Sequence, residues 1–221
     1  MNSCKHLLAL AVVVASGIGM APVHAADTAA RVNFQHERAS PDAVEIANWA
    51  VESGNHRELP FMIVDKKAAM VYVFDGKGQL RGSAAALLGA AVGDDSVPGI
   101  GERKISSILP EERTTPAGRF VAALARNIHG KEILWVDYAA AISLHRVATG
   151  NRAERRAERL VSATTRDNRI SYGCINVQAT FFDKVVMPIF KNNGIVYVLP
   201  ETKSLQQVFP SYGGAKAAAS P

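Results

Sequence analysis

Cysteine is scarce in this sequence, whose 221 residues include only Cys4 and Cys174. Cys4 precedes an apolar N-terminal run typical of an export signal, so Cys174 is the one cysteine expected in the mature chain. A single cysteine excludes an internal disulfide, and no Cys-x-x-Cys pair is present to bind a metal ion. A lone cysteine is usually a small buried apolar residue. A free thiol kept in an exported protein favours a nucleophile instead.

Long hydrophobic runs are absent beyond residue 21. The one such run, Leu7–Ala21, follows the basic Lys5 and precedes a small-x-small site that ends at Ala25. This order predicts a signal peptide over residues 1–25, and the run is short for a membrane-spanning helix. We therefore expect an exported protein of the periplasm or cell envelope, with no transmembrane segment after cleavage.

Strong charge is also lacking, since 20% of the residues are charged and the formal net charge is +5. This balance is too small to indicate nucleic-acid binding, and no basic patch is interleaved with aromatic residues. A mild positive charge suits work near anionic envelope polymers. The acidic pair Asp94-Asp95 has no matching cluster of histidines or carboxylates, so no metal site is predicted.

The sequence predicts a mainly β protein with a few helices. An N-terminal extension (26–58) contains one helix, which Ser40 caps and Pro41 begins, and which runs to about Ser53. A catalytic domain is expected over 59–201 and a C-terminal tail over 202–221, disordered at its end. The expected strands are 61–64, 70–74, 80–92, 120–125, 133–138, 141–144 and 195–199, short and frequent as in a sandwich or barrel-like core.

Three further segments are marked by their composition. Residues 151–161 contain RAERRAER and favour a solvated surface helix over an anion-binding one. Residues 180–191 predict a core-facing helix that Pro188 kinks or shortens. The glycine- and proline-rich stretch 93–118 predicts a long loop, which is often a lid over a functional site.

The hexapeptide SYGCIN at 171–176 contains the elements of a nucleophilic site. A cysteine nucleophile needs a base, backbone N–H groups for an oxyanion, and room for its substrate. Gly173 allows a sharp turn and a close approach of ligand, so the N–H groups of Tyr172, Gly173 and Cys174 are candidates for an oxyanion hole. Ser171 is placed to hold the turn. The pattern is equally consistent with a glycine turn around a buried cysteine.

The mature chain offers four histidines as the base, namely His36, His56, His129 and His145. His129 beside Gly130 indicates a hairpin turn. His145 ends the apolar strand 141–144, and a strand end is a rigid place from which to present an imidazole. A lone histidine on a strand is more often structural, so the residues alone leave the choice open.

The histidine at the strand end followed by SYGCIN resembles the L,D-transpeptidase catalytic domain, the YkuD-type fold. Residues 115–120 (TPAGRF) are similar to the Thr-Pro-x-Gly-x-Phe element of that family, and the first hairpin from Ile63 and the last strand to Pro200 are similar as well. The resemblance spans Leu59 to Pro200. It implies a β-sandwich of mixed sheets, with no metal or organic cofactor.

The resemblance implies that Cys174 is the nucleophile and His145 its base. Gly173 and the neighbouring N–H groups would form the oxyanion hole, and Asn176 would organise the loop or bind a substrate carboxylate. Three features depart from the family pattern. Tyr172 stands where many members have histidine, Arg146 stands where many have glycine, and the interval containing 151–161 is long. Arg146 would narrow the pocket or bind a carboxylate.

The implied reaction is acyl transfer on peptidoglycan stem peptides, with release of D-alanine and formation of a thioester. The acceptor is left open between a second stem peptide, a protein lysine and a free D-amino acid. Hydrolysis at the same site, as by an L,D-carboxypeptidase, is one alternative. A non-catalytic cell-wall-binding module on the same scaffold is another.

Overall fold

The structure, a computed structural model, describes residues 32–213. The predicted signal peptide (1–25) and the end of the tail lie outside them. The strands are β1 (Phe61–Asp65), β2 (Met70–Phe74), β3 (Leu80–Gly89), β4 (Gly118–Arg126), β5 (Glu132–Asp137), β6 (Ile142–Arg146), β7 (Arg169–Ser171), β8 (Ile175–Val177) and β9 (Gly194–Val198). Within residues 32–213, no helix is long and apolar enough to cross a membrane.

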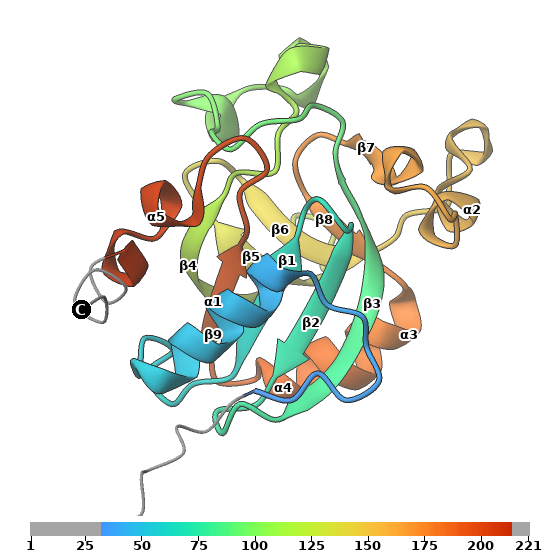
Figure 1. Cartoon of the computed structure of the whole chain (residues 1–221). Helices are drawn as coiled ribbons and strands as arrows, with labels where there is room; N and C mark the ends of the chain where they lie inside the picture. Colours follow the sequence, from blue (N-terminus) through green and yellow to red (C-terminus); the bar gives the residue numbers. More distant parts are fainter. Residues whose placement is uncertain (1–31, 214–221) are drawn as a thin grey trace, which may run out of the picture.

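The strands form one mixed sheet that closes on itself (Figure 1). Its order is β2-β1-β9-β4-β5-β6-β8-β3-β7, and an additional pairing of β2 with β3, the next-to-last strand, closes the sheet. The ten-residue β3 makes this possible, because its first half pairs with β2 and its second half with β8 and β7. The mainly β class is confirmed. The strand pairing gives a barrel-like sheet, which is one of the two forms that the strand pattern indicated, whereas the resemblance implied a sandwich.

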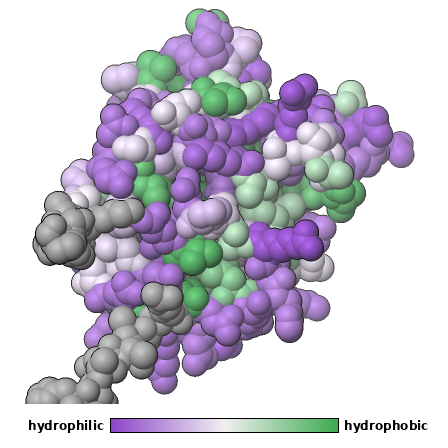
Figure 2. Space-filling model, in the orientation of Figure 1, coloured by the Kyte–Doolittle hydropathy of each residue, from purple (hydrophilic) through white to green (hydrophobic). Residues whose placement is uncertain are grey.

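Two apolar cores lie on opposite faces of β1, β2 and β9. Met62 and Val64 of β1 point into the barrel interior, whereas Phe61 and Ile63 point outward, as strand alternation requires. Helix α1 (Pro41–Glu52) covers the outer face, with Ile46 and Trp49 buried against it (Figure 1). The short helix α5 (Leu205–Val208) adds to the same outer core. Hydrophilic residues cover most of the face seen in Figure 2.

Most of the expected elements are present, with shifted ends. Ser40 caps α1 as predicted, because its hydroxyl accepts the N–H of Ala43 at 3.1 Å. The strand expected over 80–92 ends at Gly89. The predicted helix 180–191 spans 179–189 as α3 (Ala179–Phe181), the π-helical η6 (Phe182–Val186) and α4 (Met187–Ile189). Pro188 lacks the N–H that regular helical bonding requires.

Two segments differ from the sequence prediction in the short helical pieces that they contain. The loop 93–118 contains three short 3-10 turns, η1 (Ile100–Glu102), η2 (Ile105–Ser107) and η3 (Pro110–Glu112). The expected single helix over 151–161 is two pieces, η4 (Arg152–Glu154) and α2 (Arg156–Leu160). Arg155 between them adopts a left-handed conformation, with φ of 49°, and this interrupts the helix.

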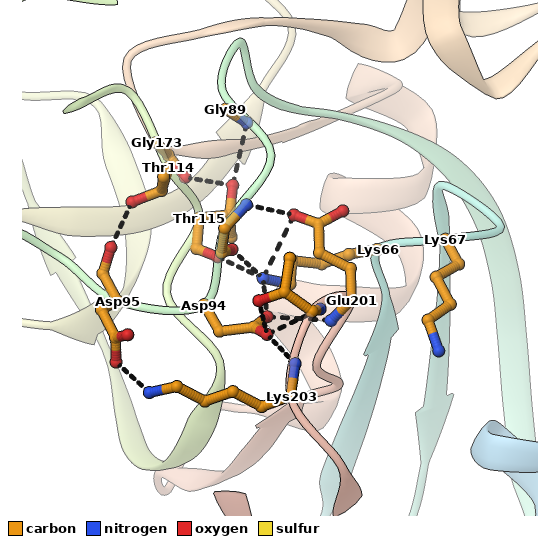
Figure 3. Close-up of polar contacts among 12 residues, drawn as sticks. Lys66, Lys67, Gly89, Asp94, Asp95, Thr114, Thr115, Gly173, Glu201 and Lys203 are labelled. Atoms are coloured by element: carbon orange, nitrogen blue, oxygen red, sulfur yellow. Dashed lines mark hydrogen bonds and ion pairs between the residues drawn. The ribbon is translucent and has the colours of Figure 1, made fainter. Parts of the chain in front are cut away.

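A buried ammonium group ties the start of the long loop to the sheet (Figure 3). Lys66 follows β1 and is 0% exposed, and its Nζ lies 2.7 Å from Asp94 and 3.4 Å from Glu201. The same Nζ donates to the backbone carbonyl of Thr115 at 2.9 Å. One cation thus joins the sheet, both ends of the loop and the segment after β9.

Asp94 receives hydrogen bonds from the C-terminal segment as well. Its carboxylate accepts the backbone N–H groups of Glu201, Thr202 and Lys203 at 2.7–2.9 Å. Burial alone would raise the pKa of Asp94, but the hydrogen bonds from Lys66, Thr202 and these N–H groups hold it well below its ordinary value. Asp94 is therefore a structural anion that fixes the loop.

Asp94→Asn should lower the free energy of unfolding by about 3 kcal/mol, because it removes the main partner of a buried cation. Urea denaturation at neutral pH measures the loss. The matched control is the neighbouring Asp95→Asn: its pair with Lys203 is exposed, and its loss should cost less than about 1 kcal/mol. Equal losses in the two variants would contradict the structural role of Asp94.

The same pair predicts a pH dependence. A carboxyl whose pKa is lower in the folded than in the unfolded chain stabilises the fold above its unfolded pKa, and this contribution is lost as the pH falls toward the folded value. The wild type should therefore lose stability below the ordinary carboxyl range more steeply than Asp94→Asn does. Parallel curves of stability against pH would contradict this assignment.

Candidate active site

Cys174 lies in the turn that connects β7 with β8, and its side chain is half-buried. The turn depends on Gly173, whose φ of +126° is a conformation that residues with side chains rarely adopt. A Cβ at Gly173 would lie 2.6 Å from the carbonyl oxygen of Thr114 and 2.7 Å from Ile142. Glycine is thus required at position 173 by backbone angle and by space.

Two hydroxyl groups hold the turn. The Ser171 Oγ accepts the N–H of Gly173 at 3.1 Å and donates to the carbonyl of Cys174 at 2.6 Å. The Thr115 Oγ1 donates to the carbonyl of Gly173 at 2.8 Å and accepts the N–H of Gly89 at 2.9 Å (Figure 3). Ser171 therefore lies where turn support was expected.

The N–H of Gly173 is used by Ser171, so the expectation that it contributes to an oxyanion hole is not supported by its hydrogen bonding. Because an oxyanion donor must point at the reacting oxygen, a committed N–H is a poor candidate. Of the three expected donors, the N–H groups of Tyr172 and Cys174 remain candidates for the oxyanion hole. Gly173 acts by allowing the turn.

His145 reaches the thiol from the adjacent strand. Strands β6 and β8 are parallel neighbours in which His145 lies opposite Asn176, so the imidazole is beside the turn that carries Cys174. The Nδ1 of His145 lies 2.8 Å from the carbonyl oxygen of Arg146. A carbonyl accepts only, so we assign the proton to Nδ1, which leaves Nε2 for the thiol.

The pKa shifts of the two groups are complementary. Burial would raise the pKa of the Cys174 thiol, but the hydrogen bond and charge of His145, with help from Ser143, lower it below its ordinary value. Burial would lower the pKa of His145, but its interactions with Cys174 and the Arg146 carbonyl raise it. These opposite shifts favour a thiolate–imidazolium pair.

Sequence reasoning missed Ser143. It lies two residues before His145 on β6, so both side chains point to the same face, and its Oγ is 3.7 Å from the Cys174 Sγ. Its backbone N–H also lowers the pKa of the thiol. The two-residue spacing from His145 was the signal that could have identified it.

Arg146 is not brought to the thiol. As the strand neighbour of His145 it points to the opposite face, where its guanidinium pairs with Asp183 at 2.5 Å and lies 4.5 Å from the ring centre of Phe182. Its Nη1 donates to the Glu132 carbonyl at 3.0 Å. These contacts explain why a bulky residue is tolerated beside His145, and they place the guanidinium away from the thiol, where we expected it to narrow the pocket or bind a carboxylate.

Tyr172 and Asn176 flank the turn. Tyr172 is 37% exposed, and the guanidinium of Arg113 from the long loop lies 4.0 Å from its ring centre. Asn176 is fully buried, and its Nδ2 donates to the carbonyl of Cys174 at 3.1 Å. Its Oδ1 accepts from Arg156 at 2.8 Å. Asn176 thus bonds to the loop that carries Cys174, where we expected it to organise the loop or bind a substrate carboxylate.

Across residues 32–213, no group of three or more histidine, cysteine or acidic side chains is arranged to hold a metal ion.

Comparison with known proteins gives likenesses in structure only, since neither a family model nor a curated protein matches the sequence. The catalytic domain of an L,D-transpeptidase from E. faecium is similar at 14% identity and a TM-score of 0.38, covering 64% of this chain and 98% of that one. An L,D-transpeptidase from Xylanimonas cellulosilytica gives 13% and 0.37, with coverage of 64% and 60%. The helical cell shape determining protein Pgp2 from Campylobacter jejuni gives 14% and 0.40, with coverage of 66% and 49%.

The first two of these solved structures are L,D-transpeptidases, the class that the sequence resembles. Their identities and TM-scores are low, and the chain matches only about half of the length of Pgp2. The assignment of chemistry therefore rests on the geometry of the Cys174 site.

The thiol of Cys174 should react with iodoacetamide at a pH below the range of an ordinary thiol, because His145 favours the thiolate. His145→Ala should move the midpoint of the rate–pH curve upward. Burial raises the pKa of the thiol, and this variant lacks the imidazole that offsets burial. The exposed His129→Ala is the control and should leave the midpoint in place. An unchanged midpoint in His145→Ala would contradict the pairing.

Gly173→Ala should destabilise the fold by about 2 kcal/mol or more, because it adds both backbone strain and overpacking. It should also slow alkylation of Cys174 in protein that remains folded. Thermal denaturation and the rate of alkylation measure the two effects. Gly150→Ala is the control, since a Cβ there meets nothing within 4 Å. Equal behaviour of the two variants would exclude the steric role of Gly173.

Proposed function

We propose that this chain is an exported, cysteine-dependent peptidoglycan L,D-transpeptidase. The observation that supports the proposal is the placement of His145 on β6 beside the strand that follows Cys174, together with pKa shifts of the two groups that run in opposite directions. A redox role is less well supported, because no second cysteine is present in the expected mature chain to resolve an oxidised thiol. The wall-directed substrate comes from the resemblance of SYGCIN and the preceding histidine to that family.

The first half of the reaction is acylation. The Cys174 thiolate attacks the carbonyl carbon that links the diamino acid of a stem peptide to the following D-alanine. The carbonyl oxygen becomes an oxyanion facing the N–H groups of Tyr172 and Cys174. The C–N bond then breaks, the imidazolium of His145 gives its proton to the departing amine, and a thioester remains.

The second half is transfer. An acceptor amine attacks the thioester carbon and loses a proton to the neutral His145, and the Cys174 thiolate leaves. Ser143 helps to stabilise the thiolate in both halves. With water as the acceptor, the same steps give hydrolysis. The residues that hold Cys174 and His145 serve both outcomes equally.

Incubation with a carbapenem followed by intact-protein mass spectrometry tests the nucleophile. We expect one covalent adduct on the wild type, none on Cys174→Ala and slow addition on His145→Ala, by about 10²- to 10⁴-fold for loss of a general base. An adduct at another residue, or turnover of stem peptides by Cys174→Ala, would overturn the mechanism.

Product analysis on purified sacculi separates the alternatives. New cross-links indicate transfer, whereas shortened stem peptides alone indicate a carboxypeptidase. A wall-binding module would bind sacculi without changing them, and Cys174→Ala would then behave as the wild type does. We expect new cross-links that depend on Cys174.

A further inference from the structure

Thr115, near the end of the long loop, bonds to the peptide unit that precedes the thiol residue. It is fully buried, and its Oγ1 accepts the N–H of Gly89 at 2.9 Å. The one hydrogen of this hydroxyl is donated to the carbonyl oxygen of Gly173, 2.8 Å away. The contact holds the Gly173 carbonyl on the side of the loop (Figure 3).

The same contact fixes the direction of the Cys174 N–H, because the Gly173 carbonyl and this N–H belong to one peptide unit. The peptide bonds of residues 32–213 are trans. In a planar trans peptide the C=O and N–H bonds point in opposite directions. The Cys174 N–H is therefore aimed away from Thr115.

The Cys174 N–H makes no hydrogen bond to any of residues 32–213. The polar groups beside it are engaged. The N–H of Gly173 donates to the Ser171 hydroxyl, and the carbonyl of Cys174 accepts from Ser171 and Asn176. Because most backbone N–H groups in folded proteins have an acceptor, an unpaired one on the residue that bears the thiol is available to a bound ligand.

The N–H of Tyr172, the other candidate for the oxyanion hole, is aimed by the main chain. It shares a peptide unit with the carbonyl of Ser171, which accepts the N–H of Ala90 at 2.9 Å. Both candidate donors are thus oriented through the carbonyl of their own peptide unit. Only the Cys174 N–H depends on a side chain for this, and that side chain is Thr115.

We infer that Thr115 is a positioning residue for acylation, whose hydroxyl directs the Cys174 N–H toward the oxyanion that forms on the substrate carbonyl. The inference rests on the proposed function and adds to it a residue outside the reacting groups. A donor that is already aimed at the developing charge needs no reorganisation during the reaction. Thr115 is fixed in turn by Lys66, whose Nζ donates to its carbonyl at 2.9 Å.

Two reactions of Cys174 separate this role from a merely structural one. In acylation by a carbapenem, the thiolate adds to the β-lactam carbonyl and an oxyanion forms. The C–N bond then opens, and the nitrogen takes a proton from His145. In alkylation by iodoacetamide, the thiolate displaces iodide from a methylene carbon and no oxyanion forms. Acylation therefore depends on the direction of the Cys174 N–H, whereas alkylation reports the thiolate and access to it.

Thr115→Val removes the hydroxyl and keeps a branched side chain. It should lower the rate constant of acylation by about 10- to 100-fold, less than complete loss of an oxyanion donor. The rate of alkylation and its pH dependence should stay as in the wild type. With a stem peptide as donor, the loss should appear in kcat more than in KM, because the N–H acts in the transition state. Thr115→Ser, which keeps the hydroxyl, should restore acylation.

Thr114→Val is the matched control, because it makes the same change one residue earlier in the loop. The Thr114 Oγ1 donates to the carbonyl of Asp95 at 2.6 Å, within the loop itself. Both rates should match those of the wild type in this variant.

A measurement on the wild type tests the inference if Thr115→Val does not fold. NMR with labelled cysteine follows hydrogen exchange at the Cys174 amide, since the expected mature chain has no other cysteine. Acylation by a carbapenem should slow this exchange, because the N–H gains the acyl carbonyl as its acceptor. Methylthiolation of the thiol adds no carbonyl and should not slow it. Equal exchange in the two adducts would overturn the inference.

The outcomes separate the inference from the proposed function. Acylation that is unchanged in Thr115→Val, or acylation and alkylation that fall together, would overturn the role of Thr115 and leave the proposed function standing. A wild type that neither a carbapenem nor a stem peptide acylates would overturn the proposed function and the inference with it. A loss of acylation alone, reversed in Thr115→Ser, supports the inference.

Discussion

The ammonium of Lys66 lies out of contact with water, and Asp94, Glu201 and two backbone carbonyls surround it and offset the cost of burying its charge. One of those carbonyls belongs to Thr115, whose hydroxyl bonds to Gly173. Thr115 thereby connects the buried charge of Lys66 to the turn that presents the thiol, because its carbonyl accepts from Lys66 and its hydroxyl donates to Gly173.

The site itself depends on parallel pairing. His145 and Cys174 are far apart in the sequence, and the β6–β8 ladder places His145 opposite Asn176, two residues after Cys174. Each reacting group is fixed from the backbone: Gly173 is clamped by Ser171 and Thr115, and the imidazole is oriented by the Arg146 carbonyl. Groups held in this way need little reorganisation when a substrate arrives.

Short sequence patterns predicted the structural features that neighbouring residues determine. The cap at Ser40, the strand Met70–Phe74 and the mainly β class follow from capping chemistry and strand propensity. The three-residue strands β7 and β8 were missed, because they are too short to show a period and exist through pairing with β3 and β6. The pairing of Arg146 with Asp183 was not predicted, since Asp183 lies on a helical segment distant in the sequence. The Lys66 network was invisible for the same reason.

The chain leaves β6 just after the histidine and returns at β7 just before the cysteine, and everything between them is a connection outside the barrel wall. Arg156 of this connection nevertheless bonds to Asn176, which in turn bonds to the carbonyl of Cys174. A change in the length of the connection would therefore leave the strands in place, whereas a change that removes Arg156 would take a hydrogen-bond partner from the buried Asn176.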